Sequence, residues 1–397
     1  MATHLKDDIL RGIQTALRHE VGSQPKEFVP LHVPTLDEVD KKFLNDCIDS
    51  SFVSSVSPYV GKFEAALAEI TGSPHVVACV NGTAALHISC LLAGVKSGDE
   101  VMMPALTFIA TANAVAYTGA VPHFVEVEEA TLAVDPRALR SHLEATAEKR
   151  GDVCVNKKTG RTIRALVVVH VFGHAADLEG LQAVCDEFGI ELIEDAAESL
   201  GTMYKGKSLG TFAKIAATSF NGNKIMTTGG GGAIFCRDEE TAKLAKHLTT
   251  TGKKPHPYLF EHDMLAYNYR LPGINAALGC AQISRVPGWF EKKRILADRY
   301  RDAFKDVKGV RFFSEVPGSK ANYWLNTLIL ESRDRKLRDE ILEHVNAKGY
   351  MVRPIWTLMN RLAMYKDAPR ATLAVSESLE DRVINIPSSP FLADGKN

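Results

Sequence analysis

One short segment organises the chain and reads Ser219-Phe220-Asn221-Gly222-Asn223-Lys224-Ile225-Met226-Thr227-Thr228, followed by glycines at 229–232. The apolar runs 216–220 and 233–236 on either side predict two strands. A lysine held between two strands has limited freedom, and surroundings that keep part of its population neutral make it a nucleophile toward aldehydes. A surface lysine in a hairpin is the alternative interpretation of Lys224.

A carboxylate ends a second apolar run, Ile190-Glu191-Leu192-Ile193-Glu194-Asp195. A lysine that forms a Schiff base and a carboxylate that pairs with a pyridinium nitrogen are the two groups that pyridoxal 5'-phosphate (PLP) requires. A helix-capping role for Asp195 is the alternative. Together the two segments predict a PLP site with Lys224 and Asp195 as its catalytic residues.

The composition is typical of a globular protein and gives no support to a polyanionic partner. Of 397 residues, 24% are charged, and 47 Lys and Arg nearly balance 48 Asp and Glu, so we expect neither nucleic acid nor an anionic membrane as a partner. The seven cysteines show no Cys-x-x-Cys spacing, which predicts reduced thiols and no metal site. No apolar run has membrane-spanning length and the N-terminus does not resemble a signal peptide, so a cytoplasmic location is expected.

Short apolar runs alternate with helical patterns through the middle of the chain. The predicted strands are 76–80, 100–103, 121–127, 165–171, 190–195 and 216–220, and the predicted helices are 84–92, 108–117, 135–148 and 178–188. Continuous apolar strands separated by helices predict an α/β fold whose mostly parallel sheet is covered on both faces. Ligands of such sheets bind at the carboxyl ends of the strands.

Three parts are predicted along the chain. They are an N-terminal helical extension at 1–27, a large α/β domain at 28–285 and a smaller α+β domain at 286–397. Apolar residues at helical spacing predict a helix at 5–19, which covers either the body of the chain or a partner subunit. Further predicted elements are helices at 35–50, 60–71 and 334–348 and strands at 310–313 and 323–330.

The turn Asn81-Gly82-Thr83-Ala84 lies between a predicted strand and a predicted helix. Free backbone N–H groups at such a helix N-terminus bind anions, and glycine allows a close approach. The helix dipole contributes only about 1 kcal/mol, so a phosphate would need further donors, of which the Ser219 hydroxyl is one. An ordinary N-cap is the alternative.

A second glycine pattern, Gly201-Thr202-Met203-Tyr204-Lys205-Gly206-Lys207-Ser208, matches the phosphate-binding loop of nucleotide hydrolases. The preceding strand ends well before Gly201, and Leu209-Gly210 is not a convincing helix start. A coincidental match is therefore favoured.

The motif Ser-Phe-x-x-x-Lys-x-x-Thr-Thr-Gly at 219–229, after Glu-Asp-Ala-Ala at 194–197, resembles the PLP-dependent sugar-nucleotide aminotransferases of the DegT/StrS type. The similarity extends from about Val29 to the C-terminus, with the motifs in the same order. The segments 52–56, 322–326 and 353–357 look most like the branch that makes amino sugars for legionaminic-type nonulosonic acids. The resemblance implies PLP fold-type I, similar to aspartate aminotransferase.

The resemblance also implies roles for individual residues. The implied cofactor-binding residues are Gly82, Thr83, Ala84 and Ser219 at the phosphate, Phe108 over the ring, Asp195 at the ring nitrogen, Glu198 near the phenolic oxygen and Lys224 in the covalent bond. Many family members have Gln in place of Glu198, and the commoner motif has Glu in place of Gly230, so the roles of both residues stay open.

A further group of residues is implied to bind substrate or to reach a second subunit. Asn268 and Arg270 match a segment that enters the neighbouring subunit's site, where Asn268 contacts phosphate and Arg270 holds a carboxylate, which implies a homodimer with shared active sites. His170, Tyr323 and Trp356 are expected substrate contacts, although a satisfied core histidine is favoured for His170.

The implied reaction moves an amino group from L-glutamate to a nucleotide-linked sugar, with Lys224 carrying the proton. The branch implies a 4-keto-6-deoxy-2-acetamido hexose on UDP or GDP, used for nonulosonic acids or surface polysaccharides. Two alternatives stay open. One is a sugar dehydratase of the same fold, a chemistry that goes with loss of the lysine. The other is a non-enzymatic regulator that binds PLP, or a nucleotide through residues 201–208.

Overall fold

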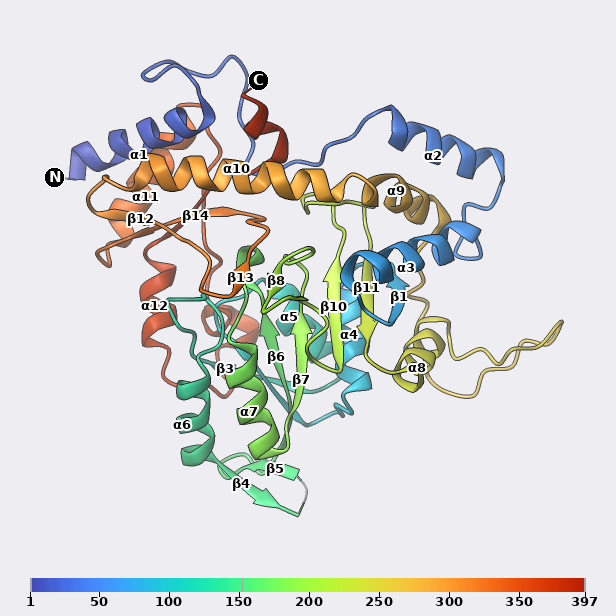
Figure 1. Cartoon of the computed structure of the whole chain (residues 1–397). Coiled ribbons are helices and arrows are strands. Elements are labelled where there is room, and N and C mark those ends of the chain that lie inside the picture. The colour runs from blue at the N-terminus through green and yellow to red at the C-terminus, as the bar shows by residue number, and fades with distance from the viewer. Residues whose placement is uncertain (1, 152, 396–397) are drawn as a thin grey trace.

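The computed structural model describes residues 2–151 and 153–395, and a nine-stranded sheet lies at its centre (Figure 1). In spatial order the strands are β1 (His75–Cys79), β11 (Gly232–Cys236), β10 (Ile215–Ser219), β7 (Glu191–Asp195), β6 (Thr162–Val169), β2 (Glu100–Pro104) and β3 (Val121–Val125). In addition β5 (Val153–Asn156) pairs with β6, and β4 (Ala147–Arg150) pairs with β5. The strands from β10 to β3 are parallel, and β11 is antiparallel to both of its neighbours. The prediction of a mostly parallel sheet in an α/β fold is confirmed.

Helices cover both faces of this sheet. They are α6 (Pro136–Thr146) and α7 (Leu178–Phe188) on one face, and α4 (Gly82–Leu92), α5 (Ile109–Tyr117) and α8 (Glu239–Thr249) on the other. Successive side chains of a strand point to opposite faces, so Leu166 and Val168 pack in one apolar cluster while Val167 and Val169 pack in another. Burial on both faces explains why the strands lack an alternating pattern.

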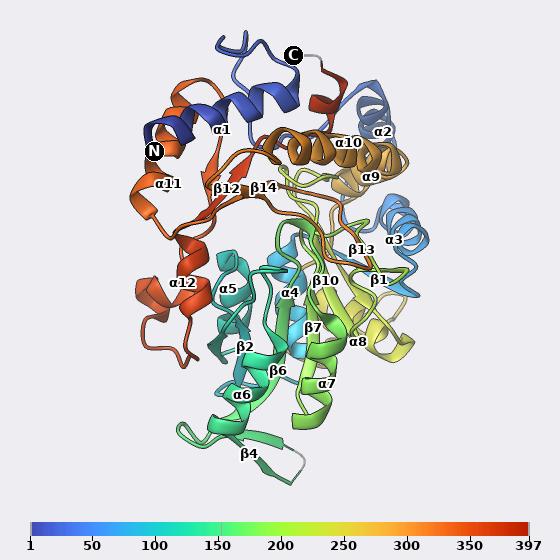
Figure 2. The same cartoon turned by 60° about the vertical axis from the view of Figure 1, so that its left-hand side comes forward.

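The N-terminal helix α1 (Ala2–Leu17) packs on the long helix α10 (Val286–Phe304), as Figure 2 shows. Ile9 and Ile13 of α1 are fully buried in the same apolar cluster as Tyr300 and Phe304 of α10. The helix predicted at 5–19 therefore covers the body of its own chain.

The C-terminal part contains a second, antiparallel sheet. Its strands are β12 (Val310–Phe312), β14 (Asn326–Leu330), β16 (Val383–Ile386) and β15 (Arg353–Pro354), and its helices are α11 (Arg335–Ala347) and α12 (Ala374–Glu380). The remaining helices are α2 (Glu38–Asp49), α3 (Pro58–Thr71) and α9 (Gly273–Ile283). The division at residues 27 and 285 stays a prediction, and its outer ends at residues 1 and 396–397 lie outside the described residues.

Several predicted elements have other bounds in the structure, and two of these differences have a clear physical reason. The strand predicted from Tyr323 begins only at Asn326, because the backbone of Tyr323 has a φ of 48°, which no strand accommodates. The helix predicted at 135–148 ends at Thr146, because the next residues pair with β5 as an antiparallel hairpin. The sequence of this hairpin lacks the alternation of apolar and polar residues that would have predicted it.

Two further expectations concern the cysteines and membrane-spanning helices. All seven cysteines are free thiols, as the sequence predicted. Among the described residues, no helix has both the length and the apolar character needed to cross a membrane.

Candidate active site

A pocket of about 390 Å³ opens at the carboxyl ends of the parallel strands, which is the place and the size range expected for a small-molecule site. The strands β6, β7 and β10 each contribute their last residue to it, namely Val169, Asp195 and Ser219. The other lining residues are Asn81, Gly82, Thr83, Leu86, Thr107, Phe108, Ala110, Thr111, Ala197, Glu198, Asn221, Asn223, Lys224, Trp324 and Trp356.

Lys224 lies in the connection between β10 and β11, which are antiparallel neighbours. The backbone N–H of Phe220 donates to the carbonyl of Gly231 at 2.8 Å, and that of Thr228 donates to the carbonyl of Phe220 at 3.0 Å, so the connection folds back on itself. A Cβ atom at Gly232 would lie 2.6 Å from the carbonyl carbon of Asn81. Only glycine therefore lets the start of β11, where this connection ends, touch the start of α4.

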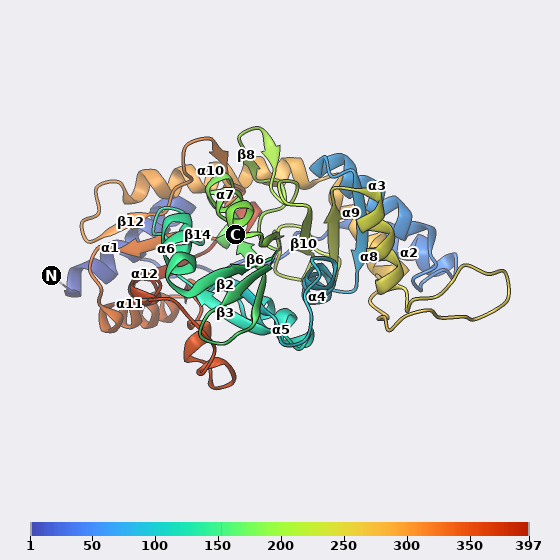
Figure 3. The same ribbon diagram turned by 90° about the horizontal axis from the view of Figure 1, so that it is seen from below.

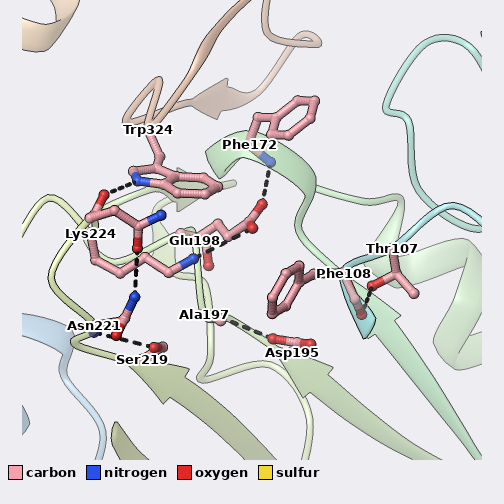
Figure 4. Close-up of polar contacts among 12 residues, drawn as sticks. Thr107, Phe108, Phe172, Asp195, Ala197, Glu198, Ser219, Asn221, Lys224 and Trp324 are labelled. Atoms are coloured by element: carbon pink, nitrogen blue, oxygen red, sulfur yellow. Dashed lines mark hydrogen bonds and ion pairs between the residues drawn. The ribbon is translucent and has the colours of Figure 1, made fainter. Parts of the chain in front are cut away.

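The amine of Lys224 lies between an aromatic ring and a carboxylate (Figure 4). Its Nζ is 3.8 Å from the centroid of the Trp324 ring and 3.5 Å from Oε1 of Glu198. The side chain of Lys224 is 14% exposed and lines the pocket, so the amine is accessible from it. A cation over an indole face is favourable, and more so where water is excluded.

Glu198 is buried next to this amine. Burial raises the pKa of Glu198 to about 7, although the positive charge of Lys224 and a backbone hydrogen bond act in the opposite direction. That hydrogen bond comes from the N–H of Phe172, which donates to Oε2 at 2.8 Å. Glu198 can thus hold or release a proton close to neutral pH, which is the range a proton-transfer group needs.

Asp195 is buried at another side of the pocket. Its Oδ2 accepts a hydrogen bond from the Thr111 hydroxyl at 2.8 Å and its Oδ1 accepts one from the N–H of Ala197 at 3.2 Å. Burial raises the pKa of Asp195, and the hydrogen bond from Thr111 opposes this. Since a carboxylate can accept about four hydrogen bonds, Asp195 retains the capacity to accept an N–H from a bound ring.

The N-terminus of α4 forms a site for an anion. Gly82 and Thr83 begin the helix, so their N–H groups have no partner within it, whereas the N–H of Ala84 donates to Oδ1 of Asn81 at 2.8 Å. A Cβ atom at Gly82 would lie 2.8 Å from Cβ of Ser219. The glycine therefore brings the Ser219 hydroxyl next to two free amides, and the three donors favour an anion.

Aromatic rings line the remaining side. Phe108 directly precedes α5 and is 53% exposed although it lines the pocket. Its ring centroid is 6.5 Å from that of Trp356, which lies 4.9 Å from the ring of Phe172. An exposed ring at the mouth of a pocket offers a flat surface to a planar ligand.

Several known proteins are similar to this chain. The model of the DegT/DnrJ/EryC1/StrS aminotransferase family matches residues 34–396. The chain belongs to this family. A GDP-perosamine synthase from Vibrio cholerae is 35% identical over 371 residues, covering 92% of this chain and 95% of that protein. A GDP-perosamine synthase from Escherichia coli O157:H7 is 33% identical, with coverages of 93% and 95%. The crystal structure of the aminotransferase TlmJ from Streptoalloteichus hindustanus superposes with a TM-score of 0.82 at 27% identity, covering 91% of this chain and 93% of that one.

As a member of this family the protein is a PLP-dependent aminotransferase of fold-type I, and the pocket fits that cofactor. Phosphate is matched by the donors at the start of α4 and on Ser219, a planar ring by Phe108, and a pyridinium nitrogen by Asp195. The aldehyde is matched by the amine of Lys224. Among the described residues, no group of three or more His, Cys, Asp or Glu side chains is arranged to hold a metal ion.

The structure brings most of the predicted site residues together. Gly82, Thr83, Phe108, Asp195, Glu198, Ser219, Lys224 and Trp356 line the pocket. Ala84, His170, Tyr323, Asn268 and Arg270 do not. The role assigned to each of these residues, inside the pocket or outside it, stays a prediction.

Two of these residues are tied into the protein interior. His170 is fully buried, with its Nε2 3.0 Å from Oε2 of Glu194. Tyr323 is also fully buried, and its hydroxyl accepts a hydrogen bond from Nη2 of Arg301 at 3.2 Å. These contacts match the core role favoured for His170 and give the Tyr323 side chain a structural role.

Residues 201–208 do not form a phosphate-binding loop. They fold as the hairpin of β8 (Met203–Tyr204) and β9 (Lys207–Ser208), with Lys205 and Gly206 at its tip in the left-handed region. In this part of the chain, which the structure describes, no helix directly follows Lys207. The helix N-terminus on which a phosphate-binding loop depends is therefore missing. The sequence match is coincidental.

Sequence reasoning missed several lining residues. Thr107, Thr111, Asn221, Asn223 and Trp324 all line the pocket. Asn221 and Asn223 flank Lys224 in the segment that organises the chain, and Trp324 lies in one of the segments that carry the family resemblance. The missed polar residues follow predicted strands, and this position was the signal that could have identified them.

The raised pKa of Glu198 predicts a pH dependence of stability. Between about pH 4.5 and about pH 7 the folded protein keeps a proton on Glu198 that the unfolded chain releases, so raising the pH through this window lowers the free energy of unfolding. Glu198→Gln cannot titrate. Over this window the variant should lose less free energy of unfolding than the native chain, by up to about 3 kcal/mol, since one pKa unit corresponds to about 1.4 kcal/mol.

Urea unfolding of the PLP-free proteins at a series of pH values measures this difference. The exposed Glu343→Gln serves as the control and should follow the native curve. Native and Glu198→Gln curves that stay parallel from pH 4.5 to pH 7 would contradict a raised pKa of Glu198.

Proposed function

We propose that this aminotransferase moves an amino group from L-glutamate to the ketone of a nucleotide-linked sugar. The observation that carries the proposal is the meeting of an anion site, a buried carboxylate and the accessible amine of Lys224 in one pocket at the sheet edge. Relatives named GDP-perosamine synthase support a nucleotide-linked sugar as the acceptor.

The residues of the chain divide the work between binding and proton transfer. Bound PLP supplies an electron-withdrawing ring that stabilises a carbanion on the substrate carbon. The amides of Gly82 and Thr83 with the Ser219 hydroxyl bind its phosphate. Asp195 accepts the ring N–H and keeps that nitrogen protonated, and Nζ of Lys224 takes the proton from the substrate carbon.

Glu198 and Trp324 control the protonation and the hydration of the Lys224 amine. Oε1 of Glu198, 3.5 Å from Nζ of Lys224, lies close enough to exchange a proton with it through a small movement. The indole face of Trp324 covers the amine on another side and keeps bulk water from it. A water-poor site strengthens each of these electrostatic interactions.

We further propose a 4-keto-6-deoxy hexose with a 2-acetamido group as the acceptor, linked to UDP or GDP. The resemblance of segments 322–326 and 353–357 to the legionaminic branch supports this choice, since Trp324 and Trp356 of these segments line the pocket. An aromatic side chain next to the cofactor site offers an apolar surface to a 6-deoxy carbon. The product would serve nonulosonic acid or surface polysaccharide synthesis in the cytoplasm.

A homodimer with shared active sites is also proposed. The loop after α8 extends away from the body (Figure 3) and carries Tyr258, Phe260 and Leu265, which are 78%, 80% and 87% exposed. Exposed apolar groups of this size on a projecting loop favour contact with another subunit. Asn268 and Arg270 follow this loop, where Nη2 of Arg270 donates to Oδ1 of Asn268 at 2.8 Å, and the proposal assigns this pair to the partner's pocket.

Absorbance spectroscopy with defined substrates tests the reaction. The PLP-loaded protein should show a visible band that L-glutamate removes and that the 4-keto-6-deoxy-2-acetamido sugar restores, with UDP-linked and GDP-linked forms compared. Lys224→Ala should lower turnover by roughly 10²–10⁴-fold, the usual contribution of a general acid–base group. The exposed Lys207→Ala is the matched control and should keep native turnover.

Some outcomes would contradict the proposed reaction. A band that L-glutamate leaves unchanged would exclude it as donor. PLP binding without turnover of the UDP-linked or the GDP-linked form would contradict the proposed sugar acceptor. Appreciable transamination by Lys224→Ala, without added amine, would contradict the role of this lysine.

Subunit mixing tests the shared site. Lys224→Ala and Arg270→Ala proteins should each be inactive, yet a hybrid dimer holds one intact site if Arg270 serves its partner's pocket. An equal mixture after subunit exchange should therefore recover about a quarter of native activity. Mixing Lys224→Ala with the double variant Lys224→Ala/Arg270→Ala forms no intact site and is the control. Proven exchange without recovered activity would contradict the shared site.

A further inference from the structure

A fully buried lysine on α10 has no role in the proposed reaction. Lys293 is 0% exposed, and its Nζ donates to the carbonyl of Trp324 at 2.8 Å and to the carbonyl of Ser388. Among residues 2–151 and 153–395 no carboxylate forms an ion pair with it, and burial lowers the pKa of Lys293 well below its usual value. An unpaired buried amine is costly to desolvate, so its two hydrogen bonds must compensate for much of that cost.

Trp324, the first of these acceptors, is held at three points. Its carbonyl accepts from Lys293, its backbone N–H donates to Oδ1 of Asn322 at 2.8 Å, and its indole N–H donates to the carbonyl of Asn223 at 2.9 Å. Nδ2 of Asn322 in turn donates to the carbonyl of Glu198 at 2.9 Å. The indole ring thus has little freedom to move relative to the pocket.

The held ring acts directly on the catalytic amine. Its centroid lies 3.8 Å from Nζ of Lys224, and its N–H binds the carbonyl of Asn223, the residue before Lys224 (Figure 4). The ring therefore contacts both the end of the lysine side chain and the backbone that carries it. A displacement of Trp324 would move Lys224 as well.

The second carbonyl that accepts a hydrogen bond from Lys293 is that of Ser388. Ser388 follows β16, and its hydroxyl oxygen accepts a hydrogen bond from the N–H of Asn326 at 2.7 Å, at the start of β14. Lys293 thus joins α10 to the ends of two strands of the C-terminal sheet, directly beside the segment that holds Trp324.

We propose that Lys293 is a positioning residue for Lys224: by binding the carbonyls of Trp324 and Ser388 it fixes the indole ring that sets the place of the catalytic amine. The inference rests on the proposed role of Lys224 as the PLP attachment site. Lys293 itself touches neither the cofactor site nor the pocket, because it is not among the lining residues.

The rate at which PLP attaches to the PLP-free full-length protein tests this role, followed by the growth of the visible band. Lys293→Met keeps the length of the side chain and removes its donors. Attachment should slow on the order of tenfold, because small misplacements of a reacting group have large effects on rate. Lys292→Met is the matched control, since Lys292 is the neighbouring lysine of α10 and pairs with Asp394 at the surface. Its rate should stay within about twofold of native.

A double-variant cycle separates positioning from general stabilisation. If Lys293 acts through the ring, Lys293→Met should cause no further slowing in a Trp324→Leu protein. Equal slowing in both backgrounds would overturn the inference, as would a native rate in folded Lys293→Met. Where Lys293→Met does not fold, Lys293→Gln keeps an NH₂ donor group on a shorter side chain without the charge. This variant should attach PLP more slowly than native, and a native rate would overturn the inference.

The same experiment keeps the two proposals apart. A PLP-loaded Lys224→Ala protein that still shows the covalent visible band would remove the attachment site on which both depend. Normal attachment at Lys224 together with an unchanged rate in Lys293→Met would contradict the positioning role alone.

Discussion

The close contact of the end of β10 and the start of β11 with the start of α4 is the constraint on which the rest of the site depends. A Cβ at Gly232 would lie 2.6 Å from the backbone of Asn81, and one at Gly82 would lie 2.8 Å from Ser219. Two glycines therefore bring together the helix amides, a serine hydroxyl and the loop that carries Lys224. The anion site and the reactive amine are fixed to one junction, so the distance between them is a property of the fold.

The pocket is completed from both parts of the chain. The sheet supplies Asp195 and Ser219 at strand ends, where parallel strands direct their last residues to one edge. The C-terminal part supplies Trp324, which covers the amine of Lys224, and Trp356, which also lines the pocket. Glu198 and Asp195 are both buried carboxyl groups with raised pKa values, a combination that is common at functional sites.

The sequence predicted those features that depend on local pattern. Continuous apolar runs predicted the strands of the central sheet, and Lys224, Asp195 and Gly82 were found because each follows or ends such a run. Features that depend on contacts between distant segments were not predictable. Trp324 faces Lys224, a residue distant in the sequence, and its backbone is hydrogen-bonded to Lys293 and Asn322. The left-handed backbone of Tyr323 delays the start of a strand that its β-favouring side chains suggested. The packing of α1 on α10 also joins segments that are far apart in the sequence, so the local pattern of either helix does not predict it.

The most direct measurement is to find which lysine carries the cofactor. Incubation of the full-length protein with PLP, reduction with borohydride and peptide mapping by mass spectrometry would locate the bond. We expect one labelled peptide, containing Lys224, because this amine is accessible from the pocket whereas that of Lys293 is fully buried. Label on another lysine, or no specific label after visible PLP binding, would contradict the site described here.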